Sequence, residues 1–288
     1  MEVRGWLLTS PYLLYSLVFF LIPLGWSLWL VFTNWNLISP RIDFIGLENF
    51  VKAFKSARVH AAFLSAYRIM GFFLPMVLVQ SLAVALLINS LPWGRAFFSV
   101  GFFMPYLASG VAVALVVRGI LAYNSPAAPI FKALFGTIPN WFGHPVLAVF
   151  IISLLIAWKF SGYYALIFLA GLQSIPKELY EAAELDGARF FTKLFRITLP
   201  MLYPAFYTVL IMAVGLCFAI FTEPFMLTGG GPGRATHTWY LEIYYQVFQN
   251  LRAGYGAAIS FINAAITFTS VLIVRRLMQR WGRALGYE

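Results

Sequence analysis

Six apolar stretches, each long enough to cross a lipid bilayer as a helix, alternate along the chain with more polar stretches. Lipid offers no hydrogen-bond partner to the backbone, so we expect helices, which satisfy their own N–H and C=O groups. The segments between the stretches are rich in Pro, Gly and Asn, as loops are. The pattern predicts an all-α integral membrane protein, with one transmembrane domain over residues 1–288. The expected spans lie near residues 12–32, 61–89, 97–122, 146–171, 201–225 and 256–274.

The composition excludes a large soluble enzyme. Hydrophobic residues make up 61% of the 288 residues and charged residues only 10%, against about 25% charged residues in soluble domains. The net charge of +10 is typical of basic cytoplasmic loops beside anionic lipid headgroups, and we do not expect nucleic-acid binding. The single cysteine, Cys217, excludes an internal disulfide.

Basic residues predict the orientation of the spans. If the N-terminus lies in the cytoplasm, the inner segments carry ten Lys and Arg residues and the outer segments carry seven. Four of the inner ones lie in the loop 173–200, and Arg275, Arg276, Arg280 and Arg283 directly follow the last span. The positive-inside rule therefore favours cytoplasmic positions for both termini.

The loop 173–200 has the pattern of two short helices joined by a turn. Ser174 is a suitable N-cap, Pro176 suits the first turn, and Glu178 lies where the helix dipole favours a negative charge. Gly187 suits a left-handed helix end. We therefore expect a first cytosolic helix over about Pro176 to Gly187.

The first of these helices has the properties of a docking element. Ala182 and Ala183 are small and allow another backbone to come close, while Glu181, Glu184 and Asp186 offer charged contacts around them. The second helix is expected to lie back on the bundle through its apolar residues. These are Phe190, Phe191, Leu194, Phe195 and Ile197.

The same loop resembles a known signature. It resembles the EAA motif of permease subunits of bacterial ABC importers. The matching positions are Glu181-Ala182-Ala183, then Gly187 after three residues, Ile197 after nine more, and Leu199-Pro200 after one more. The chain further resembles sugar permeases of the maltose and glycerol-3-phosphate type, the first of two subunits, over nearly its whole length. The segments that carry this likeness are Phe32–Asn36, Phe44–Phe50, Leu169–Ala183 and Leu227–Pro232. Unlike the maltose permease, the chain has no large external insertion.

The resemblance implies a type I ABC importer permease fold with six spans, in the bacterial cytoplasmic (inner) membrane. It implies a complex with a second, homologous permease, two ATPase subunits, an external solute-binding protein, membrane lipid and a sugar substrate. It also implies that Glu181, Ala182, Ala183, Asp186 and Gly187 couple the permease to the ATPases. The dipeptide Gly-Lys is absent, so a nucleotide loop is not expected here. ATP and Mg would be bound by the ATPase subunits, and this chain would not be an enzyme.

The outer turn Gly229-Gly230-Gly231-Pro232 is expected to face the binding protein. Two short amphipathic segments in outer loops, residues 46–54 and 129–135, either dock an external protein or anchor at the interface. His60, His144 and His237 lack metal-ligand spacing, and we interpret them as ordinary loop residues.

Residues of the fourth and fifth spans are candidates for the substrate pathway. Charges within or at the edges of spans are Arg68, Arg118, Lys159 and Glu223, and such groups indicate a pathway. The first two and Glu223 lie toward the outer side, where snorkelling or mutual pairing also explains them, whereas Lys159 is deeper. Aromatic and polar groups beside Lys159 suit a sugar. These are Trp158, Tyr163 and Tyr164. The resemblance places Tyr163 on a substrate-contacting tyrosine and puts Ala213, Leu216, Cys217 and Thr222 on facing positions of the fifth span.

Three alternatives stay open. All these pathway residues also fit simple helix packing. An ABC permease for a non-sugar solute would share the coupling motif. An ion-coupled secondary transporter would use ionisable residues at mid-depth and internal repeats, of which only Lys159 is present.

Overall fold

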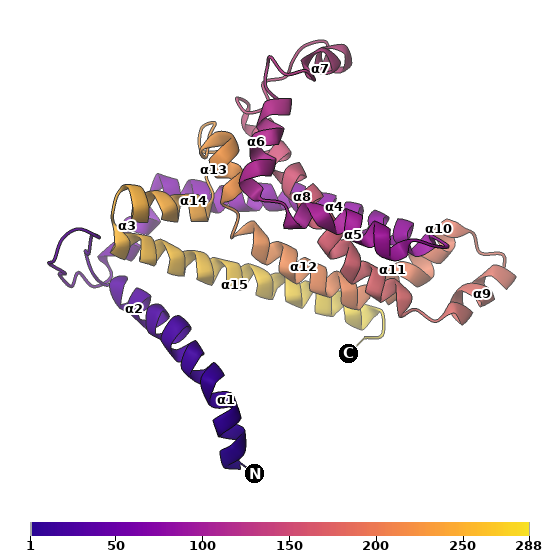
Figure 1. Ribbon diagram of the computed structural model, residues 1–288, viewed down its shortest axis with the longest axis horizontal. Coiled ribbons are helices and arrows are strands. Elements are labelled where there is room, and N and C mark those ends of the chain that lie inside the picture. The colour runs from indigo at the N-terminus through magenta and orange to yellow at the C-terminus, as the bar shows by residue number, and fades with distance from the viewer. Residues whose placement is uncertain (1, 288) are drawn as a thin grey trace.

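The chain folds into an elongated helical bundle in the computed structural model, which describes residues 2–287 (Figure 1). No strand occurs within those residues, so the all-α prediction is confirmed. Four helical stretches are long and apolar enough to cross a membrane, and the number is six if two bent helix pairs each count as one span. The four stretches are Leu8–Leu30, which runs through α1 (Glu2–Ser16), η1 (Leu17–Leu21) and α2 (Ile22–Leu30), then α4 (Ala57–Ser90), α8 (Pro145–Gln173) and α15 (Ala253–Ala284).

The stretch 97–122, which the sequence suggests is continuous, is in fact bent, and a second bend lies where the loop 173–200 meets the span expected from residue 201. α5 (Arg95–Leu107) and α6 (Gly110–Ile120) meet at 88° because the backbone leaves the helical conformation at Ala108 and Ser109. The second bend, of 67°, separates the helical run Phe190–Met201 from α12 (Tyr203–Cys217). That run comprises α10 (Phe190–Lys193), the π-helical η2 (Leu194–Thr198) and α11 (Leu199–Met201). Pro204 lies at the start of α12, and proline suits the first turn of a helix but not its interior.

The stretch 201–225 is also interrupted at its far end. α12 ends at Cys217, and α13 (Thr222–Thr228) is a separate short helix. The Asn263 side-chain amide of α15 donates a hydrogen bond of 3.3 Å to the carbonyl oxygen of Phe218. This bond gives a partner to a backbone group that the helix end leaves free.

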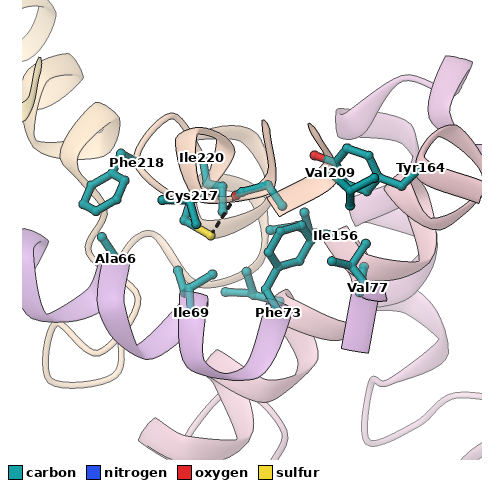
Figure 2. Close-up of a cluster of buried hydrophobic side chains, with 14 of the residues drawn as sticks. Ala66, Ile69, Phe73, Val77, Ile156, Tyr164, Val209, Cys217, Phe218 and Ile220 are labelled. Atoms are coloured by element: carbon teal, nitrogen blue, oxygen red, sulfur yellow. Dashed lines mark hydrogen bonds between the residues drawn. The ribbon is translucent and has the colours of Figure 1, made fainter. Parts of the chain in front are cut away.

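The core lies between α4, α8 and α12. On α4 the buried residues Ala62, Ala66, Ile69, Phe73 and Val77 repeat every three or four positions, as one face of a helix does. Figure 2 shows side chains from α4, α8 and α12 meeting in this cluster. The helix order is completed by shorter elements. These are α3 (Glu48–Lys55), α7 (Ala128–Phe135), α9 (Lys177–Leu185), α14 (Trp239–Tyr244) and the π-helical η3 (Tyr245–Gln249).

The bundle has two distinct ends along its long axis. α9 and α10 lie at one end, near the C-terminus, whereas α3 lies at the other (Figure 1). α1 and α2 run away from the bundle, and only 6% of their most apolar window is buried within the chain. This large uncovered apolar surface is what a helix in contact with lipid or another membrane subunit presents.

A buried asparagine and a glycine hold the end of α2 on the bundle. The Asn49 side-chain amide of α3 donates hydrogen bonds of 2.8 Å to the carbonyl oxygens of Val31 and Thr33. A methyl group on Gly254 of α15 would collide with the Thr33 carbonyl oxygen. The close approach therefore requires glycine, and it fixes this end of the first span to the rest of the chain.

Candidate functional site

The short helix α9 projects from the bundle between α8 and α10 (Figure 1). It begins after Pro176, and the Ser174 hydroxyl donates to the Gly171 carbonyl oxygen at 2.7 Å instead of capping α9. The N-cap expectation for Ser174 was therefore wrong, because its side chain closes the end of α8. Glu181, Ala182, Asp186 and Gly187 are exposed and Ala183 is partly buried, so the structure leaves most of the predicted coupling residues accessible.

The C-terminal end of α9 is closed as the sequence predicts. Gly187 has φ +75°, in the left-handed region that favours glycine. The Gly187 N–H donates to the Glu184 carbonyl oxygen at 2.9 Å, and the Ala188 N–H donates to the Ala183 carbonyl oxygen at 2.8 Å. These two bonds form a Schellman motif, which ends the helix and turns the chain.

Side chains tie α9 to the segment that leads into α12. The Lys193 ammonium forms an ion pair with the Glu184 carboxylate at 2.7 Å, and the Tyr180 hydroxyl lies 3.0 Å from the Thr198 hydroxyl. α9 also follows α8 after only three residues. A displacement of α9 would therefore be transmitted to both α8 and α12.

The expectation that the second helix lies back on the bundle through all its apolar residues was wrong. Phe190, Phe191 and Phe195 have exposed fractions of 61%, 69% and 63%, while Leu194 and Ile197 are partly buried. The helix is tied to α9 and α12 along one side, so the three phenylalanines point away from this chain.

Lys159 of α8 forms a mostly buried ion pair with Glu223 of α13. The ammonium nitrogen and carboxylate oxygen lie 3.4 Å apart, and the two side chains are 14% and 10% exposed. Gly110, the first residue of α6, lies directly over the pair, since a methyl group there would come within 3.2 Å of the Lys159 nitrogen. The same methyl group would lie 3.1 Å from the Thr222 side chain. The pair thus joins α8 to α13 beside the bend between α5 and α6.

An aromatic cluster continues from this ion pair along α8. The rings of Tyr163 in α8 and Tyr106 in α5 are stacked, with their centroids 4.7 Å apart and their planes at 16°. Phe160 and Phe103 contact the same Tyr106 ring. Lys159 and Tyr163 are four residues apart and therefore share one face of α8. Both are partly exposed, so charge, hydroxyl groups and aromatic rings meet on a surface that solvent or a ligand reaches.

The other predicted pathway residues do not join this surface. Tyr164, Ala213 and Cys217 lie in the hydrophobic core, with exposed fractions of 2%, 0% and 0%. Figure 2 shows Tyr164 and Cys217 there. Trp158 lines a separate apolar cavity of about 700 Å³ between α6 and α8. Leu216 is partly buried against the core. We keep Lys159, Tyr163 and Thr222 as candidates for the pathway and leave the other five out.

The Gly229–Pro232 turn packs closely on the residues that follow it. The Thr236 hydroxyl donates to the Gly231 carbonyl oxygen at 2.7 Å, and the Tyr245 hydroxyl donates to the Gly229 carbonyl oxygen at 3.2 Å. Gly230 is buried and has φ +93°, whereas Gly229 is exposed and Gly231 and Pro232 are partly exposed. Only part of the predicted protein-facing turn is therefore accessible.

His237 is not an ordinary loop residue, which corrects the expectation from sequence. It is buried, and its Nε2 lies 2.6 Å from a carboxylate oxygen of Glu242. The other Glu242 oxygen accepts a hydrogen bond of 2.7 Å from the Gln246 amide. This network fixes α14 and η3 beneath the glycine turn, which explains why the turn is so well packed.

Sequence reasoning missed Tyr106, Gly110 and the pairing of Glu223 with Lys159. The signal for the pair was present, because two opposite charges in otherwise apolar segments usually find each other. Tyr106 and Gly110 carry no local signal. Their roles depend on how α5 and α6 cross α8.

The Lys159–Glu223 pair yields a direct prediction. Lys159→Met or Glu223→Gln alone leaves one buried charge without a partner, which costs about 3 kcal/mol or more. We expect each single variant to unfold at a lower temperature in detergent than the double variant Lys159→Met/Glu223→Gln, which has neither charge. If the effects of the two single changes simply add in the double variant, the two side chains are not coupled.

Comparisons with known proteins identify a family and relatives that this chain resembles. The family described as "Binding-protein-dependent transport system inner membrane component" matches residues 63–283. The probable ABC transporter permease protein YesP of Bacillus subtilis (strain 168) is 32% identical over 97% of this chain and 92% of its own. The multiple sugar-binding transport system permease protein MsmF of Streptococcus mutans is 31% identical, over 90% of this chain and 89% of its own.

A solved structure has the same fold. It is that of a bacterial alginate ABC transporter in complex with an alginate pentasaccharide-bound periplasmic protein, and the matched chain has a TM-score of 0.81. Its sequence identity is 23%, and the match covers 96% of this chain and 95% of that chain.

Proposed function

Because this chain belongs to the family of inner membrane components of binding-protein-dependent transport systems, we propose that it is one of two permease subunits of an ATP-driven importer for a sugar or sugar derivative. It is a transport component of the membrane rather than an enzyme. Its partners in this proposal are a second, homologous permease, two ATPase subunits and an external solute-binding protein.

The geometry of α9 carries the proposal. The helix projects from the bundle, is closed by a Schellman motif, and is tied through Glu184 and Tyr180 to the segment before α12. A groove in an ATPase subunit would take the exposed face around Glu181 and Ala182. With α9 in the cytoplasm, both termini lie there too, and α3 lies on the outer side.

Two observations support a sugar substrate. The MsmF relative belongs to a multiple sugar-binding transport system. The surface around Lys159 and Tyr163 combines aromatic rings, which pack on the C–H face of a sugar, with groups that pair with hydroxyls. Tyr106, Thr222 and Glu223 complete this wall of the pathway, and the partner permease would supply the opposite wall.

The proposed mechanism is alternating access. ATP binding closes the ATPase dimer and shifts α9, which moves α8 and α12 together. Because the Lys159–Glu223 pair joins α8 to α13, that movement reaches the outer helices and opens the pathway to the binding protein. Hydrolysis reverses the change, and no bond of the sugar is made or broken in this chain.

Uptake measurements test this function. Radiolabelled sugars and non-sugar solutes are supplied with the cognate binding protein to proteoliposomes that contain the complex and internal ATP. We expect uptake of a sugar that stops when ATP is removed, with the ion gradient kept. Uptake that continues without ATP would indicate a secondary transporter, and uptake of only non-sugar solutes would refute the substrate class.

A further inference from the structure

A polar cavity of about 790 Å³ lies at the α3 end of the bundle, which is the end opposite α9 (Figure 1). Lys52, Arg58 and Arg252 line it. No carboxylate lines it among the residues that the structure describes. The site described above does not include this cavity.

The cations of the cavity are largely free to bind an anion. Within the described residues, no carboxylate lies within 4.0 Å of the Arg58 or Arg252 guanidinium groups. Lys52 pairs with Glu48 at 2.8 Å, but both side chains are more than half exposed, and such a pair is weak. Glu242 does not line the cavity, and its two carboxylate oxygens are already bonded to His237 and Gln246.

Two long helices add to the positive potential. Ser56, the N-cap of the 34-residue α4, and Arg252, the N-cap of the 32-residue α15, both line the cavity. The partial positive charge of each helix N-terminus therefore lies beside the same space. The Asn34 and Asn250 side chains also line the cavity, but their amides already donate hydrogen bonds to Asp43 and Gln246.

The surroundings of the cavity are apolar and exposed. Val51 and Phe54 of α3 are 49% and 62% exposed. Trp35 lines the cavity, and its ring contacts that of Trp26 in α2, with centroids 6.5 Å apart. Tryptophan and short amphipathic helices of this kind are typical of the boundary between headgroups and acyl chains.

We propose that this cavity binds the phosphate headgroup of an anionic phospholipid, whose acyl chains lie along the exposed apolar surfaces of α2 and α3. A phosphodiester matches the planar donors of Arg58 and Arg252, and the net negative charge of the headgroup matches the unpaired cations. An acidic protein surface would match the charges but not the adjoining apolar helices. The inference uses only the membrane location of the chain and does not depend on its substrate.

The test measures lipid binding to the full chain, purified in detergent with the subunits that accompany it. Native mass spectrometry compares phosphatidylglycerol with phosphatidylethanolamine, each alone and in competition with inorganic phosphate. The variant is Arg58→Gln/Arg252→Gln. Its matched control is Arg41→Gln/Arg234→Gln, which removes the same charge from exposed outer-loop arginines that do not line the cavity.

We expect phosphatidylglycerol to bind more tightly than phosphatidylethanolamine. The cavity variant should lose about thirtyfold in phosphatidylglycerol affinity, since each of the two basic residues near the headgroup contributes about fivefold. The control should keep its affinity, and both variants should keep their melting temperature.

Equal loss in the control, or equal binding of the two lipids, would overturn the proposal. Displacement of the lipid by equimolar inorganic phosphate would indicate a free-anion site instead. If the cavity variant binds lipid normally but no longer captures the solute-binding protein, the cavity instead binds an acidic protein surface.

Discussion

Uptake is expected to fall by about tenfold or more in the variant Gly187→Pro, while the amount of chain in the membrane stays unchanged. Proline requires φ near −65°, whereas Gly187 has φ +75°, and proline also removes the N–H that bonds to the Glu184 carbonyl oxygen. The nine-residue α9 is too short to be stable without its contacts and caps. Its last turn would therefore unwind, and the Glu184–Lys193 pair would be lost with it.

Gly136→Pro is the matched control for this experiment. Gly136 ends the eight-residue α7 with φ +73°, so the same change is made at the end of another short helix. Transport assays in proteoliposomes, normalised to the amount of chain, compare the two variants. If Gly187→Pro transports as well as Gly136→Pro, the end of α9 has no part in coupling.

The second large effect is expected for Gly162→Ala in α8. An added methyl group would collide with the carbonyl oxygen of Phe102, because α5 crosses α8 in direct backbone contact at Gly162. Neither backbone can move away without disturbing the stacked Tyr106 and Tyr163 rings. Overpacking of this kind costs about 1–3 kcal/mol, and we expect a lower melting temperature together with loss of uptake.

Gly101→Ala provides the control on the facing helix. It lies in α5, and nothing lies within 4 Å of an added methyl group. Since alanine favours a helix over glycine by about 1 kcal/mol, this variant should be as stable as the natural chain or more so. Thermal unfolding in detergent and uptake are measured on both variants. A Gly162→Ala chain that melts and transports normally would show that the close crossing is not required.

The sequence predicts the helical class and much of the core because both follow from local pattern. The apolar face of α4, from Ala62 to Val77, is visible in the spacing of its residues. The bends are harder to predict. Pro204 marks the start of α12. At the other bend, neither Ala108 nor Ser109 is a residue type that ends a helix by itself. Tertiary packing against α8 and α13 decides the conformation there.

The predicted site shows the same division between local and distant information. The end of α9 at Gly187 was predicted because a left-handed cap is a local property. Trp158 and Lys159 were grouped because they are neighbours in sequence, yet successive residues of a helix point in different directions, and only Lys159 reaches the wall beside Tyr163. The Lys159–Glu223 contact joins positions 64 residues apart, and such a contact depends on the fold.

Site-specific crosslinking of α9 tests the central claim most directly. Cys217 is buried and is the only cysteine in the sequence. In a Cys217→Ser background, a single introduced cysteine is therefore the only thiol of the chain that can be crosslinked. The variant Ala182→Cys, exposed on α9, is compared with Lys55→Cys, exposed on α3 at the other end of the bundle. With a short bismaleimide, we predict that Ala182→Cys links to an ATPase subunit that carries a cysteine in its docking groove and that Lys55→Cys does not. A link from Lys55→Cys with none from Ala182→Cys would contradict the account.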